Sequence, residues 1–171
     1  MQSFYTVVRY LAYLIEILVF FIIEQSPTFP LKTNGLFPTL LVPAAVVIAL
    51  FEGEKVGTIF GLIIGVILDI GYSGTLGVCS VLMACMGFFV GTLSRKVIRC
   101  NFFTSMITLC ISTLIFYLVH FAFYYLLQGY SDILYTLTTH YLPRFFYTIL
   151  VSPIIYFFNR SFAINIKGKE A

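Results

Sequence analysis

The stretch that decides the fold reads VGTIFGLIIGVILDIG and covers residues 56–71. Most of its residues are apolar, and Gly57, Gly61, Gly65 and Asp69 recur at every fourth position. Because residues four apart lie above one another on the same side of an α-helix, this spacing predicts an apolar helix with one face of glycines. Glycines on a helix face let the backbone of another helix approach closely, which is common in membrane proteins.

Apolar segments of helical length recur on both sides of this stretch. The predicted helices cover about residues 4–23, 36–51, 56–71, 76–93, 102–127 and 142–159. Of the 171 residues, 60% are hydrophobic and 10% are charged, whereas an ordinary soluble domain has roughly 45–50% and 25%. A water-soluble fold of this size could not bury so much apolar surface. The bilayer is therefore the predicted solvent, since a helix needs about 20 apolar residues to cross it.

The predicted fold class is an all-α integral membrane protein with six transmembrane helices in a single domain, residues 1–171. A membrane β-barrel would show segments of about ten residues with alternating polarity, which these segments lack. The second segment has only 16 residues and contains Pro38 and Pro43, so a bent, tilted or partly re-entrant helix is an alternative there. Residues 130–139 suit a short interfacial helix.

Lysine and arginine residues predict the orientation, because they are retained on the cytoplasmic side during insertion. With six crossings, eight of the ten basic residues fall on one side. These eight are Arg9, Lys55, Arg95, Lys96, Arg99, Arg160, Lys167 and Lys169. Both chain ends are therefore predicted to be cytoplasmic. The same topology explains the net charge of +3, so the expected partner is membrane lipid and no nucleic acid.

Small residues on the fourth segment match the glycine face of the third. They are Gly77, Ser80, Ala84, Gly87 and Gly91. One hypothesis is that the two faces form a docking groove or the floor of a cavity. The simpler interpretation, mutual packing of the two helices, is favoured because the short turn after Gly71 makes them antiparallel neighbours. Docking stays open for the rest of each face.

Four ionisable residues fall inside or at the ends of apolar segments, namely Glu16, Asp69, His120 and Arg144. A charge at mid-membrane costs about 2.5–3.5 kcal/mol, so each should find a partner. The topology places all four in the outer half of the membrane. We predict a cluster in which Arg144 bridges Asp69, with Glu16 as a second candidate partner and His120 as a hydrogen-bonding neighbour. Its role would be to tie helices together or, alternatively, to form a ligand pocket or proton path.

Enzymatic activity is not expected from this sequence. It lacks the HExxH and GxSxG motifs, a Ser-His-Asp order and a glycine-rich phosphate loop opening a helix. Its four cysteines form no CxxC pair and have no histidines at metal-binding spacing. The sequence therefore predicts neither a metal site nor a cofactor.

The stretch from Leu40 to Arg95 resembles the core of the bacterial rod shape-determining protein family MreD. The resemblance rests on Gly61, Gly65, Asp69, Gly77, Arg95 and Lys96. It implies a non-enzymatic component of the cell-wall elongation machinery in the bacterial cytoplasmic membrane, working with the membrane-anchored protein MreC. Through MreC, the family is linked to the filament protein MreB, the glycan polymerase RodA and its partner transpeptidase.

Two other functions remain as alternatives. MreD proteins are similar in architecture to the substrate-binding S components of energy-coupling-factor vitamin transporters, which are also small six-helix proteins. That class implies an Ala-xxx-Ala motif on the first helix, whereas here Ala12 is followed four residues later by Glu16. A small proton-coupled transporter is the third possibility, although no inverted repeat or pair of broken helices is evident.

Overall fold

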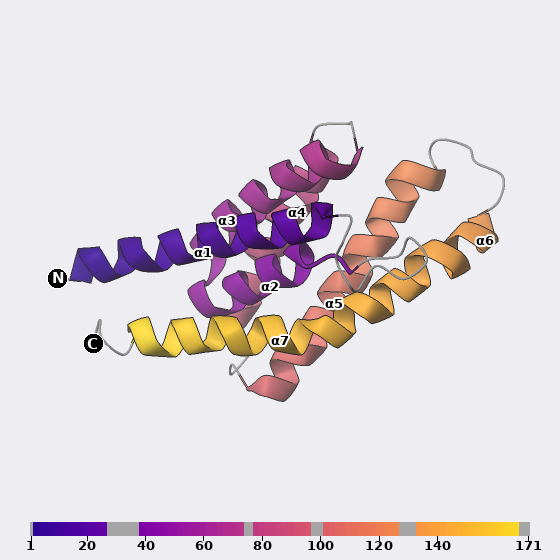
Figure 1. Cartoon of the computed structure of the whole chain (residues 1–171). Helices are drawn as coiled ribbons and strands as arrows, with labels where there is room; N and C mark the ends of the chain where they lie inside the picture. The colour runs from indigo at the N-terminus through magenta and orange to yellow at the C-terminus, as the bar shows by residue number, and fades with distance from the viewer. Residues whose placement is uncertain (1, 27–37, 74–76, 97–100, 127–132, 168–171) are drawn as a thin grey trace.

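The computed structural model describes residues 2–26, 38–73, 77–96, 101–126 and 133–167. Within these ranges the secondary structure is helical and contains no strand. Figure 1 shows long helices packed side by side around shorter ones. The predicted all-α fold class is confirmed.

Each of the six predicted segments overlaps a helix. The helices are α1 (Gln2–Gln25), α2 (Leu41–Glu52), α3 (Glu54–Leu68), α4 (Val78–Lys96), α5 (Phe102–Phe121), α6 (Ile133–Thr136) and α7 (Leu142–Lys167). Single π-helical turns follow α3 and α5 and join α6 to α7; they are Asp69–Ser73, Ala122–Leu126 and Leu137–Tyr141. The predicted helix limits at residues 36, 76 and 127, and the first part of the proposed interfacial helix, lie outside the described residues.

The second predicted helix is the centre of the structure. All residues from Leu41 to Leu50 are buried, because α1, α3, α4, α5 and α7 all contact α2. Its 12 residues rise only about 18 Å, which suits a helix surrounded by protein. Pro43 lies in the first turn, where a backbone N–H has no partner within the helix and its loss is tolerated.

Within the described residues, four stretches are long and apolar enough to cross a membrane. They are Thr6–Gln25, Val78–Arg95, Phe102–Tyr124 and Leu137–Ser161. Large apolar side chains such as Ile15, Phe103 and Leu150 point outward from them and are 60%, 76% and 75% exposed. Water would not tolerate such a surface, whereas lipid does. The chain is a multi-pass membrane protein.

The beginning of α1 and the end of α7 lie at the same end of the molecule (Figure 1). A chain that crosses the membrane an even number of times has its first and last helix ends on the same side. The full count of six, which requires α2 and α3 to complete their crossings, stays a prediction. The last long helical stretch begins earlier than predicted, at Ile133 rather than Leu142, because the π-helical turn before Pro143 continues α6 into α7.

Candidate functional site

The glycine face of α3 packs directly on α4. A Cβ added at Gly61 would lie 2.5 Å from the carbonyl oxygen of Met83, and one added at Gly65 would lie 2.6 Å from that of Cys79. At Gly57 it would meet both the carbonyl of Gly87 and the Cβ of Ala49 on α2. These glycines therefore serve contact between the helix backbones inside the domain, and a larger side chain would push α3 and α4 apart.

Asp69 ends this glycine face and binds the start of α4. Its carboxylate accepts hydrogen bonds from the backbone N–H groups of Gly77 (2.9 Å), Cys79 (3.0 Å) and Ser80 (3.0 Å). The Ser80 hydroxyl donates a fourth bond at 2.6 Å. Asp69 is fully buried, and its charge is stabilised by the positive end of the α4 dipole.

Gly77 is needed at this contact for its backbone shape. Its φ of +118° lies in a region that side chains with a Cβ rarely adopt. No atom lies within 4 Å of the Cβ that would be added there, so the conformation, and not crowding, selects glycine. The spacing from Gly57 to Asp69 and on to Gly77 is thus explained by one joint between two helices.

The predicted cluster of four ionisable residues needs a correction at Glu16. The Glu16 carboxylate accepts a 2.6 Å hydrogen bond from Nδ2 of Asn159 on α7. Asn159 lies about four helical turns, roughly 22 Å, beyond Arg144 along the same helix. Glu16 therefore belongs to a different level of the membrane than Arg144. Residue counts alone did not predict the depth of Glu16 in the membrane, because that depth depends on the register between α1 and α7.

A second member of that predicted cluster is His120. Nδ1 of His120 is 3.2 Å from the hydroxyl of Tyr141, and the ring packs on Tyr124 with 4.4 Å between centroids. His120 thus lies among aromatic side chains. An ion pair between Arg144 and Asp69 stays a prediction.

A polar network that the sequence did not predict joins α1, α2, α5 and α7. The hydroxyl of Thr148 on α7 lies 3.0 Å from that of Tyr117 on α5 and accepts the backbone N–H of Thr39 at 3.1 Å. The Thr39 and Tyr117 hydroxyls are also hydrogen-bonded. Glu24 of α1 accepts the first backbone N–H groups of α2, that of Leu41 at 3.0 Å. A carboxylate at a helix N-terminus is favoured by the helix dipole.

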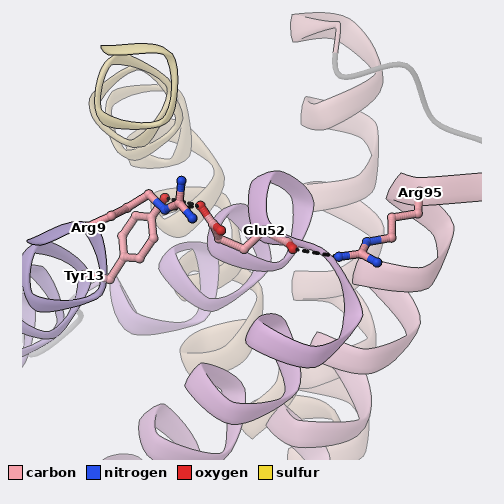
Figure 2. A network of polar contacts seen from close by, with 4 residues as sticks. All are labelled: Arg9, Tyr13, Glu52 and Arg95. Atoms are coloured by element: carbon pink, nitrogen blue, oxygen red, sulfur yellow. Dashed lines mark hydrogen bonds and ion pairs between the residues drawn. The ribbon is translucent and has the colours of Figure 1, made fainter. Parts of the chain in front are cut away.

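A second unpredicted network lies at the other end of α1 and α2 (Figure 2). Nε of Arg9 is 3.1 Å from Oε1 of Glu52, and both side chains are almost completely buried. The Tyr13 hydroxyl donates to the same oxygen at 3.0 Å. Arg95 of α4 donates to the backbone carbonyl of Glu52 at 3.5 Å. Its side chain also fills the space beside Gly53, whose φ is +88°.

The sequence contained a signal for this network. A basic residue inside an apolar segment requires a partner or water, yet Arg9 was assigned only to membrane topology. Glu52 and Glu54, in the short turn between two apolar segments, received no role. Removing one partner of a buried ion pair costs more than the pair itself contributes, so this contact fixes α1 on α2.

A cleft of about 320 Å³ separates part of α1 from α7. Its lining residues are Ala12, Tyr13, Ile15, Glu16, Val19, Phe20 and Phe158. All of these residues except Glu16 are aliphatic or aromatic. Ile15 and Phe158 are 60% and 48% exposed, so the cleft opens toward the surrounding lipid. Among the residues that the structure describes, no group of three or more His, Cys, Asp or Glu could hold a metal ion.

Comparison with known proteins supports the resemblance seen in the sequence. Residues 5–164, nearly the whole chain, match the family model described as rod shape-determining protein MreD. No curated protein and no solved structure matches. The likeness to transporter S components therefore stays a prediction.

Proposed function

The chain belongs to the family of rod shape-determining protein MreD, and from this premise we propose that it is a non-enzymatic scaffold of the bacterial cell-wall elongation machinery that binds an MreC-like protein. The observation that carries the proposal is the family match over residues 5–164. A scaffold acts by holding partners in place, so its surface should offer lateral contacts and its interior should be rigid.

The arrangement of polar groups supports a scaffold. Asp69 accepts hydrogen bonds that join α3 to the start of α4. Glu52 contacts Arg9 of α1 and Arg95 of α4. Thr148 joins α2, α5 and α7. Polar residues in a membrane interior are often functional sites, but these ones hold helices together. The outward faces of the long helices remain available for lipid and for other membrane-spanning helices.

The proposed location is the bacterial cytoplasmic membrane, with both chain ends in the cytoplasm. The distribution of basic residues supports this orientation, as does the common side on which α1 begins and α7 ends. An MreC-like partner would in turn connect the protein to MreB, RodA and the elongation transpeptidase. No covalent chemistry is part of the proposal.

Two measurements test the proposed function. Depletion of the protein in its own rod-shaped bacterium should produce round cells, and purification in mild detergent should recover the MreC-like protein with it. The Leu62→Phe variant, altered only on the lipid-facing side of α3, serves as the matched control and should restore rods. Cells that stay rod-shaped after depletion, together with saturable vitamin binding by the purified protein, would contradict the proposal in favour of a transporter component.

A further inference from the structure

The cleft between α1 and α7 has an acidic group at an unusual depth. Glu16 lies near the middle of the apolar stretch Thr6–Gln25 and lines the cleft. Its side chain is 94% buried, with an exposed fraction of 6%. A carboxyl group at mid-membrane is costly unless hydrogen-bond donors or a cation meet it.

Hydrogen-bond donors are scarce around Glu16. Asn159 uses both hydrogens of Nδ2, one on Glu16 and one on the carbonyl of Ile155 at 3.1 Å. Oδ1 of Asn159 is buried and, within the described part of the chain, has no hydrogen-bond partner. The carboxylate likewise accepts a single hydrogen bond from the residues that the structure describes. The Glu16–Asn159 pair therefore has more hydrogen-bond acceptors than donors.

The depth of this pair restricts what can complement it. The acyl chains around an apolar span have no hydrogen-bond donor to offer. A membrane-spanning helix can present a donor side chain at mid-membrane, where hydrogen bonds between helices contribute to association. The small side chain of Ala12 in the cleft wall allows such a helix to approach closely.

We propose that the α1–α7 cleft is the docking site for a single membrane-spanning helix of the binding partner, which places a hydrogen-bond donor such as Ser, Thr, Asn or Lys against Glu16. This inference rests on the proposed function and adds to it the surface and the chemistry of the contact. The helix packs along Ile15, Val19 and Phe158, and its donor meets the carboxylate between them.

Bulk and charge can be varied separately to test the cleft. Ala12→Trp fills the cleft and should lower the amount of partner recovered by about 10-fold, because a helix excluded from its site loses most of its contact. Glu16→Gln keeps the shape and should lower recovery by about 3-fold, as expected from the loss of a stronger acceptor in a membrane. Leu14→Trp, at a 37% exposed position on another face of α1, is the matched control and should bind as the unaltered protein does.

Photo-crosslinking supplies a second measurement that does not depend on the variants folding. A photoreactive side chain at Val19, inside the cleft, should form an adduct that mass spectrometry maps to the membrane-spanning segment of the partner. The same group at Leu14, which is 37% exposed on another face of α1 and does not line the cleft, should label mainly lipid.

The outcomes separate this inference from the proposed function. Unchanged partner recovery with Ala12→Trp, or adducts from Leu14 and none from Val19, overturns the cleft proposal and leaves the scaffold function standing. Loss of a copurifying lipid from Ala12→Trp in native mass spectrometry, with partner binding intact, overturns it in favour of a lipid site. Failure of the unaltered protein to recover the partner in both detergent and nanodiscs contradicts the proposed function itself.

Discussion

The α3–α4 pair and α1 are joined to the protein in different ways. Along α3 and α4, the glycines at 57, 61 and 65 bring two backbones into contact over their whole common length. In contrast, only 22% of the residues in an apolar 18-residue window of α1 are buried. α1 is held by polar contacts at three separate levels, made by Arg9 with Glu52, by Glu16 with Asn159, and by Glu24 with the start of α2.

This difference reflects how helices associate in lipid. The hydrophobic effect drives little association there, because lipid tails are as apolar as the side chains. Close backbone packing then needs a continuous row of small residues, and such a row leaves no space between the helices. Separate polar contacts fix a helix at points and leave space between them, which is where the cleft beside Ala12 and Glu16 lies.

The largest effect should come from a substitution that separates α3 from α4 at their joint. Gly61→Leu would force a side chain into the carbonyl of Met83, and we expect a loss of more than about 3 kcal/mol in the free energy of unfolding. Unfolding in mixed micelles measures this change. Leu62→Phe, one residue away and 50% exposed to lipid, should stay within about 0.5 kcal/mol. Equal losses in the two variants would mean that α3 and α4 are not tightly packed at their joint.

The attachment of α1 through Arg9 and Glu52 should be nearly as sensitive. Glu52→Ala removes the carboxylate that pairs with the buried Arg9 charge. We expect a loss of about 3 kcal/mol in the free energy of unfolding. A double variant, Arg9→Met with Glu52→Met, should recover much of this loss because no unpaired charge remains. Lys55→Ala, an exposed neighbour, is the control. If the double variant were the least stable of the set, the ion pair would have a larger net contribution than we infer.

A smaller effect is expected at Asp69, which lies at the end of the α3–α4 joint. Asp69→Asn replaces one accepting oxygen by an NH₂ group, so some of the four donors from α4 lose their acceptor. We expect a loss of about 2 kcal/mol in the free energy of unfolding. Hydrogen exchange should show faster exchange in the first turn of α4 than in the middle of that helix. Uniform exchange along α4 would contradict the local role of Asp69.

The smallest effect should arise at the attachment of α1 through Glu24. Glu24→Gln keeps an oxygen acceptor for the backbone N–H of Leu41 but removes the charge at the helix N-terminus. We expect a loss of about 0.5–1 kcal/mol in the free energy of unfolding. Raised salt should not change this loss much, since the carboxylate is 4% exposed and buried charges are weakly screened. A loss as large as that of Glu52→Ala would show that α1 is fixed equally at both ends.

Several features of the candidate site could be predicted from the sequence. The glycine spacing from 57 to 65 and the aspartate at 69 pointed to a close helix pair, and the structure places these residues at such a joint. The position of Glu16 was wrong, since its partner is Asn159 and not Arg144. The contact of Arg9 with Glu52 was missed, because the two residues are far apart in the sequence and nothing local links them.

Composition and periodicity alone determined that this chain is a multi-pass bundle of apolar helices, because transfer into lipid depends on which residues a segment contains. Tertiary structure decided that the second helix is the core. A segment that is apolar on all sides has the same pattern whether protein or lipid surrounds it. Tertiary structure also decided which polar residues meet, since partners must share both a facing side and a depth. Those depend on the register of all the helices together, which no single segment specifies.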